Sequence, residues 1–168
     1  MEKITIMLRV GVTELNIGFE NREEAKKCCL EVMEEASANG VELLVFPEMT
    51  LTGFTMRPWL YAESWDADNI PDSVSFFMEN SRKYKMKMAF GYIRAVMADS
   101  DKMDDETKEP VYENRLVLVD GEKVVLDYAK IHPFSYSGED KVYRAGEKLV
   151  QAPVSYTHLR AHETLMNL

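Results

Sequence analysis

The stretch from Asn21 to Pro47 constrains the fold more than any other part of the sequence, because it joins a complete helix signal to a short apolar run. Glu24 stands three residues after the capping side chain of Asn21, which is the spacing of a capping box. Apolar or small residues then recur at helical spacing, at Ala25, Cys28, Cys29, Val32, Met33 and Ala36. Gly40 supplies a left-handed stop, so we predict an amphipathic helix between Asn21 and Gly40.

A buried strand is predicted directly after this helix, over Val41–Phe46, because the run is short, apolar and ended by Pro47. Asp72 is expected to cap a second helix that extends to about Tyr84. Further strands are predicted over residues 3–13, 86–96, 112–119 and 123–128, the last two joined by a tight Asp120-Gly121 turn. The resulting β-α-β-α-β-β-β order predicts an α/β fold in which helices first alternate with strands and a hairpin follows.

Composition and charge limit the classes of partner. The chain has 168 residues, of which 46% are hydrophobic and 29% charged, as expected for one globular domain. Its net charge of −9 argues against nucleic acid or an anionic membrane surface as the main partner, because either would repel it. No apolar run approaches the roughly 18 residues that a membrane span needs, and the N-terminus does not resemble a signal peptide. We therefore expect a cytoplasmic protein.

Two segments are set apart from this domain. Residues 99–109 are nearly all charged or polar, which favours a solvated hairpin tip or insertion over a binding site. The last sixteen residues, 153–168, show no clear helical or strand period and resemble the translation of a common sequencing adapter. We therefore expect a partial domain over residues 1–152 and a non-native tail after it. His158 and His162 stand four residues apart, but they belong to this tail, so no metal site is predicted.

Glu48 is the first candidate for chemistry. It follows the apolar strand in Phe-Pro-Glu-Met-Thr-Leu-Thr-Gly-Phe, residues 46–54, at the end of the strand where α/β sheets collect their ligand sites. A carboxylate held there among Phe46, Phe54 and Trp59 would be partly desolvated, which would raise its pKa toward the range useful for a general base. Taken alone, a Glu after a strand is more often an ordinary surface residue.

Lys130 is the second candidate. It ends a predicted strand in Tyr-Ala-Lys-Ile-His-Pro, residues 128–133, at the start of a loop. A lysine in this position can stabilise an oxyanion that develops during acyl transfer, although most lysines at strand ends point into solvent. His132, two residues later, is expected to shape the loop rather than to transfer a proton.

Together the two segments resemble the motifs of the nitrilase superfamily of carbon–nitrogen hydrolases. Phe-Pro-Glu-x-x-x-x-Gly-Phe is similar to the general-base motif of that family, and Tyr-x-Lys-x-His is similar to its lysine motif. Tyr112-Glu113-Asn114 matches the usual run-in to the lysine, and the resemblance extends over residues 3–150. It implies the N-terminal part of a four-layer α-β-β-α sandwich, with homo-oligomers when the protein is intact and with no cofactor.

The resemblance also implies a Glu-Lys-Cys triad that hydrolyses an amide or nitrile of a small metabolite. Glu48 would accept the thiol proton, Lys130 would stabilise the tetrahedral intermediate, and Glu139 matches a second family Glu that orients the lysine. We assign Phe54, Tyr112 and Asn114 to substrate binding. The Gly-Glu-Asp-x-x-Tyr-x-Ala-Gly spacing of residues 138–146 is closest to the amidase branch that acts on ω-amides of keto acids, while nitrile and N-carbamoyl cleavage would use the same triad.

The third member of the triad has no counterpart in this sequence. Cys28 and Cys29 lie on the apolar stripe of the first predicted helix and are interpreted as core thiols. The enzyme hypothesis is that these residues form a fragment of a hydrolase, inactive without the Cys. The alternative is a non-catalytic, truncated homologue that serves as a binding or oligomerisation partner. A nucleotide-binding module is disfavoured, because no Gly-rich phosphate loop follows the first strand.

Overall fold

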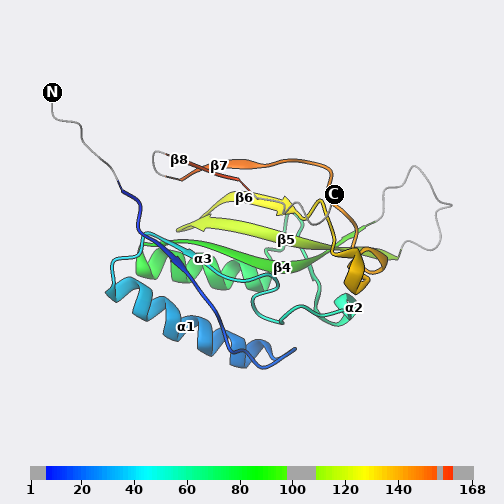
Figure 1. The fold of residues 1–168 in the computed structure, drawn as a ribbon, viewed down its shortest axis with the longest axis horizontal. Coiled ribbons are helices and arrows are strands. Elements are labelled where there is room, and N and C mark those ends of the chain that lie inside the picture. Colours follow the sequence, from blue (N-terminus) through cyan, green and yellow to red (C-terminus); the bar gives the residue numbers. More distant parts are fainter. Residues whose placement is uncertain (1–6, 98–108, 155–156, 161–168) are drawn as a thin grey trace.

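The computed structural model describes residues 7–97, 109–154 and 157–160, which form a sheet with helices on one face (Figure 1). The elements along the chain are β1 (Val10–Val12), α1 (Arg22–Ala38), β2 (Leu43–Val45), α2 (Pro58–Tyr61), β3 (Glu63–Ser64), α3 (Asp72–Tyr84), β4 (Lys87–Met97), β5 (Pro110–Asp120), β6 (Lys123–Ala129), the 3-10 turns η1 (Ser135–Ser137) and η2 (Glu139–Lys141), β7 (Gln151–Val154) and β8 (Thr157–Arg160).

The main sheet is mixed. Within the described residues it has six strands in the order β1-β2-β4-β5-β6, with β3 beside β4. The β-α-β part supplies parallel pairs, and β5 pairs in the antiparallel sense with β4 on one side and with β6 on the other. The predicted alternation of strands and helices followed by a hairpin is therefore confirmed. The short α2 and β3 were not predicted, because the aromatic-rich segment that holds them has no clear period of either kind.

The two long helices begin in different ways. At α1 the Asn21 side chain accepts a hydrogen bond from the Glu24 backbone N–H at 3.2 Å, as the capping signal predicts. The prediction that Asp72 caps α3 is wrong, because Asp72 is already the first helical residue. The carboxylate of Glu63, from β3, instead accepts the Ser73 backbone N–H at 2.9 Å and the Ser73 hydroxyl as well. A distant strand residue therefore satisfies the orphan donor at this helix start.

The sheet is covered on both faces. The face toward α1 and α3 carries the larger apolar core, in which the Phe77 ring stacks on Phe90 with centroids 3.9 Å apart. Cys29 is fully buried in this core, and burial, followed by the effect of neighbouring Cys28, raises the pKa of the Cys29 thiol to about 12. The opposite face carries a smaller core that includes Ala152 of β7. Figure 1 shows β7 and β8 on the side of the sheet away from the helices.

The outer segments differ in part from the sequence predictions. The first strand is shorter than the predicted 3–13, since only Val10–Val12 pair with β2, and residues 1–6 lie outside the described residues. Residues 98–108, most of the predicted polar insertion, lie outside them too. Residues 153 and 154 pair with 157 and 158 in the β7–β8 hairpin, which the sequence pattern did not suggest. That residues 153–168 are non-native stays a prediction. In the described part of the chain, no helix is long and apolar enough to span a bilayer.

Candidate active site

Glu48 lies just beyond β2, where Gly91 of β4 lets two backbone segments come into contact. A Cβ atom at Gly91 would stand 2.5 Å from the Met49 backbone nitrogen and 2.9 Å from the Glu48 Cα, closer than side chains tolerate. The Thr50 backbone N–H donates to the Gly91 carbonyl at 2.9 Å, and the Gly91 N–H donates to Thr50 Oγ1 at 3.1 Å. The turn after Glu48 is therefore fixed directly to the middle of the sheet.

Lys130 directly follows β6 and is held by its backbone on two sides. Its N–H donates to the Asn114 carbonyl on β5 at 2.9 Å, and its carbonyl accepts from the Gly146 N–H at 2.8 Å. Position 146 requires a glycine, because its backbone lies so close to β6 that a Cβ atom there would stand 2.3 Å from the Ala129 carbonyl oxygen. This contact explains why a glycine stands in the Tyr143-Arg-Ala-Gly segment. Lys130 is thus anchored between the sheet and the segment after η2.

Four side chains named from the sequence meet at this point, and we call them the lysine cluster: Glu48, Asn114, Lys130 and Glu139. The Lys130 Nζ atom lies 3.0 Å from Glu139 Oε2 and 3.2 and 3.3 Å from the two carboxylate oxygens of Glu48. The Asn114 Nδ2 group donates to Glu48 Oε2 at 3.0 Å and to Glu139 Oε1 at 2.9 Å. The ammonium and the amide therefore each bridge the same two carboxylates.

Glu139 is the buried member of the cluster. Its side chain is 0% exposed, and it begins η2 after Gly138, whose φ of 81° is a left-handed conformation suited to glycine. Besides Lys130 and Asn114, it accepts the Phe134 backbone N–H at 2.6 Å. A carboxylate removed from water is tolerated because charged and neutral donors engage both of its oxygens.

The charge state of Lys130 follows from these contacts. Burial alone would lower the pKa of the Lys130 ammonium, but its hydrogen bond to Glu139 and its attraction to the Glu48 and Glu139 carboxylates outweigh burial and raise that pKa. Lys130 is therefore fully protonated at neutral pH. A protonated amine, 19% exposed and held in one place, can stabilise negative charge that forms on a bound substrate.

Glu48 is more open than its sequence suggests. The prediction that aromatic residues desolvate its carboxylate is wrong, since the side chain is 55% exposed. Phe46 packs into the core on the helix face and contacts Phe77, and Trp59 is itself 59% exposed. The neighbours of the Glu48 carboxylate are therefore polar groups, Lys130 and Asn114, and its outer side faces solvent.

The residues assigned to substrate binding are placed differently from one another. Phe54 lies beside the cluster, with the Lys130 Nζ atom 5.9 Å from the centre of its ring, and it is 37% exposed. Tyr112 is partly buried and packs against the small core of Met49, Ile93 and Tyr143. Asn114 is 5% exposed and directs both of its amide hydrogens at carboxylates.

Tyr143 makes a supporting contact that the sequence did not reveal. Its hydroxyl donates to the Thr55 carbonyl at 2.6 Å, and its side chain is only 3% exposed. This bond joins the segment that follows Glu139 to the loop that follows Glu48. The Tyr143-Arg-Ala-Gly spacing contributes to the family resemblance, but nothing local to it indicates a partner 88 residues away.

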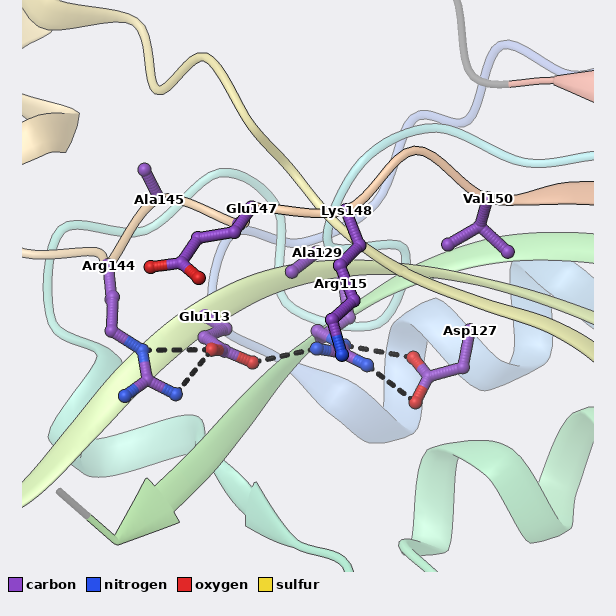
Figure 2. A pocket seen from close by; sticks show the side chains of 10 residues that line it. Glu113, Arg115, Asp127, Ala129, Arg144, Ala145, Glu147, Lys148 and Val150 are labelled. Carbon is purple, nitrogen blue, oxygen red and sulfur yellow. Dashed lines mark hydrogen bonds and ion pairs between the residues drawn. The ribbon is translucent and has the colours of Figure 1, made fainter. Parts of the chain in front are cut away.

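A second charged group, the arginine cluster, also escaped the sequence interpretation; it comprises Arg94, Glu113, Arg115, Asp127 and Arg144. The Glu113 carboxylate accepts from Arg115 at 2.8 Å and from Arg144 at 2.6 Å, and Arg115 forms a two-point bond with Asp127 at 2.9 and 2.6 Å. Figure 2 shows this chain of ion pairs beneath the segment that carries Arg144 to Val150, beside a cavity of about 320 Å³.

The two cysteines lie apart from the lysine cluster. Cys29 is buried in the helix-side core, and the Cys28 thiol contacts the Asn16 carbonyl, so neither belongs to the lysine cluster. No group of three or more His, Cys, Asp or Glu side chains that could hold a metal ion occurs among the residues that the structure describes.

Comparisons with known proteins identify the family and the fold of the chain. The model of the carbon–nitrogen hydrolase family matches residues 9–159. An amidase from Nesterenkonia sp. AN1, whose structure shows acrylamide added to the active-site cysteine, superposes with a TM-score of 0.72 at 13% identity, over 92% of this chain and 56% of that one. Nit3 of Saccharomyces cerevisiae, a member of the nitrilase superfamily, gives a TM-score of 0.71 at 17% identity, over 90% of this chain and 53% of that one.

A curated relative, the glutamine-dependent NAD(+) synthetase of Thermotoga maritima, is 28% identical over 145 residues, which are 85% of this chain and 23% of that protein. The chain thus spans about half the length of the solved structures it resembles and about a quarter of this relative. The family match, the mixed sheet and the meeting of both motif residues lead to one conclusion: this chain belongs to the carbon–nitrogen hydrolase family of the nitrilase superfamily.

Proposed function

We propose that the chain forms part of a hydrolase that cleaves non-peptide carbon–nitrogen bonds of small amides or nitriles. The observation that carries this proposal is the position of the Lys130 ammonium, which lies within 3.3 Å of the carboxylates of Glu48 and Glu139. A fixed cation beside an open carboxylate supplies two of the groups that acyl transfer needs, an oxyanion stabiliser and a base. As a structural ion pair, Lys130 and a carboxylate as exposed as that of Glu48 would stabilise the fold only slightly.

The proposed roles of Glu48 and Glu139 follow from how exposed each carboxylate is. Glu48, the open carboxylate, accepts the proton of a cysteine thiol, and the thiolate sulfur then attacks the substrate carbon. For an amide, Lys130 stabilises the oxyanion of the tetrahedral intermediate. The C–N bond then breaks, with the leaving nitrogen taking the proton from Glu48. Water attacks the thioester, its proton passes through Glu48 to the released thiol, and a carboxylic acid departs. Glu139, which is fully buried, orients Lys130 and does not itself react.

The nucleophilic cysteine in this proposal comes from a part of the protein outside the present residues, since Cys28 and Cys29 lie on α1. The family fold supports the same view. We propose that the mixed sheet and its helices form one half of an α-β-β-α sandwich, whose second sheet packs on the face opposite α1 and α3. The intact protein would then associate as a homo-oligomer, as the family resemblance implies.

The proposed substrates are small and carry an amide or nitrile. Binding of acrylamide by the Nesterenkonia amidase supports a small amide. The lysine cluster has two carboxylates for one ammonium, which gives no support to a substrate that carries a carboxylate at the reacting end. The ω-amides of keto acids suggested by the Tyr143-Arg-Ala-Gly spacing carry their carboxylate at the end remote from the amide, so the charge of the lysine cluster does not count against them.

The test is an assay of ammonia release by the protein that carries this chain, over a panel of aliphatic amides, ω-amides, N-carbamoyl compounds and nitriles. We expect hydrolysis of at least one member and its loss in Glu48→Gln and Lys130→Ala. Lys123→Ala is the matched control, because Lys123 is an exposed lysine at the other end of β6. Activity that survives in Glu48→Gln or Lys130→Ala would contradict the assignment. A protein that hydrolyses no member of the panel would favour a non-catalytic binding or oligomerisation partner.

A further inference from the structure

We propose that Asn114 is a positioning residue of the site, whose amide fixes the Glu48 and Glu139 carboxylates on either side of Lys130 without contacting the substrate. This inference rests on the proposed function and deepens it. Asn114 touches all three other members of the lysine cluster. Its side chain donates to both carboxylates, at 3.0 and 2.9 Å, and its backbone carbonyl accepts the Lys130 N–H at 2.9 Å.

The surroundings of Asn114 suit it to hold other groups in place. It lies inside β5, opposite Ile93 of β4, in a strand that is paired on both sides. The residue is 5% exposed, so its amide has no open face toward a substrate. An amide group offers two hydrogens, and each is directed at a different carboxylate. A substrate could take one of these hydrogens only by displacing Glu48 or Glu139.

The neutrality of the amide matters for the electrostatics of the cluster. Two carboxylates face one ammonium, so the cluster carries one excess negative charge. Asn114 supplies hydrogen-bond donors to both carboxylates without adding positive charge, which leaves a carboxylate able to accept a proton. An arginine or lysine at the same position would neutralise the excess charge and compete with Lys130. An aspartate would add a third negative charge and provide no donor.

The contacts also distinguish the two oxygens of Glu48. Oε2 accepts from both Asn114 and Lys130, at 3.0 and 3.2 Å, and is therefore held in place. Oε1 has a single, longer contact among the described groups, at 3.3 Å from the Lys130 Nζ atom. Because the side chain is more than half exposed, Oε1 is the oxygen oriented to accept the thiol proton. Asn114 therefore determines which oxygen is held and which one reacts.

Asn80 provides a matched control. It is also a buried asparagine, 7% exposed, but its amide donates to the Phe76 carbonyl within α3, at 2.8 Å, and contacts no carboxylate. Replacing Asn80 removes a buried amide and its hydrogen bond without changing the lysine cluster. Any effect shared by Asn80→Ala and Asn114→Ala therefore reports folding, and only the difference between them reports positioning.

The experiment compares Asn114→Ala, Asn114→Asp and Asn80→Ala in the protein that carries this chain. We expect kcat for amide hydrolysis to fall about a hundredfold in Asn114→Ala, with KM unchanged, as for a displaced catalytic group. Asn114→Asp keeps the shape of the side chain, so its loss of activity, expected to be at least as large, cannot come from an empty cavity. Asn80→Ala should keep the unmutated kcat.

A second measurement does not depend on activity. The pKa of Lys130, followed by NMR of its ammonium nitrogen, should fall in Asn114→Ala, because carboxylates that are no longer held near Lys130 stabilise its charge less. It should be unchanged in Asn80→Ala. A raised KM with unchanged kcat would show that Asn114 binds substrate, and an unchanged Lys130 pKa in Asn114→Ala would show that it holds nothing in place. Either result overturns the inference. An inactive unmutated protein with the expected NMR response would instead contradict only the proposed function.

Discussion

The lysine cluster and the arginine cluster occupy opposite faces of the same end of the sheet. Glu113 and Asn114 are consecutive residues of β5, and consecutive strand residues point to opposite faces. The arginine cluster has three guanidiniums for two carboxylates, and Glu113 and Asp127 each accept from two arginines. The lysine cluster has two carboxylates for one ammonium, and one of those carboxylates, Glu48, is more than half exposed.

Under the proposed function, this difference separates a structural charge network from a reacting one. In the arginine cluster both carboxylates are largely buried, and each is engaged by two guanidinium groups, so neither faces solvent as Glu48 does. Burial lowers the pKa of the Arg115 guanidinium, but its bonds to Asp127 and its attraction to Glu113 raise that pKa overall. The lysine cluster keeps an unequal count of charges and an open carboxylate. A cavity of about 320 Å³ lies beside the arginine cluster, so the presence of a cavity alone does not identify the reacting centre.

A large loss of both activity and stability is expected from Glu139→Gln, which removes the buried charge that pairs with Lys130. Activity should fall by about a hundredfold or more, because Lys130 loses its closest carboxylate and moves. The pKa of Lys130 should fall too. Since that pKa is raised in the folded protein, the ion pair stabilises the fold at neutral pH, and this contribution is lost as the pH rises through the raised value.

The measurements for this prediction are steady-state hydrolysis and urea unfolding between neutral and alkaline pH. Asp140→Asn is the control, because Asp140 is the next residue and is exposed. A Glu139→Gln protein whose stability falls with rising pH as steeply as that of the unmutated protein would contradict the account.

The second prediction concerns how much the arginine cluster stabilises the fold. Glu113→Ala should destabilise the fold by about 3–5 kcal/mol, since it leaves Arg115 without one buried partner and frees Arg144. Glu48→Ala should cost less than about 1 kcal/mol, as expected for an exposed ion pair. Urea unfolding of both variants measures the difference. Equal losses of stability would remove the distinction between a structural and a reacting cluster.

Gly91→Ala should have a smaller effect, on both stability and activity. The added methyl group would meet the backbone of Met49 and Glu48, so we expect a loss of about 1–3 kcal/mol together with reduced activity. Gly121→Ala is the control: the turn residue Gly121 has a φ of 60° but no atom within 4 Å of an added Cβ. It should lose some stability and no activity. Full activity in Gly91→Ala would show that the contact does not position Glu48.

The smallest expected effect is a difference in the rates at which the two cysteines are alkylated. Because burial raises the pKa of the Cys29 thiol to about 12, that thiol stays protonated at neutral pH and should react slowly with alkylating reagents. Cys28 is partly exposed and should be modified first. Mass spectrometry after timed labelling, with Cys28→Ser and Cys29→Ser as the two controls, gives the order. Faster modification of Cys29 would contradict its placement in the core.

The sequence predicted those features that depend on neighbouring residues. The α1 cap at Asn21, the order of the main helices and strands along the chain and the tight turn at Gly121 follow from short spacings, and all are confirmed. The motif residues Glu48 and Lys130 were recognised, and the structure brings them together. Contacts that join distant segments were missed or wrongly attributed, since no local pattern encodes them.

The start of α3 is one example, because the carboxylate that caps it belongs to Glu63, ten residues away from Ser73. The split between Glu113 and Asn114 is another. In a strand, these consecutive side chains point to opposite faces. Their partners, Arg144 and Glu48, are 31 and 66 residues away along the chain. The resemblance assigns Asn114 to substrate binding, and no local pattern indicates that its amide is directed at two carboxylates.

The most direct test of the central claim compares kcat/KM for amide hydrolysis in Glu48→Gln and Glu113→Gln, two variants that each replace one carboxylate by an amide of the same shape. Because Glu48 is the open carboxylate of the lysine cluster, Glu48→Gln should lose a factor on the order of 10² to 10⁴. Glu113→Gln, on the opposite face, should keep its activity at temperatures where it remains folded. A Glu48→Gln protein as active as Glu113→Gln would contradict the claim that the lysine cluster is the reacting centre.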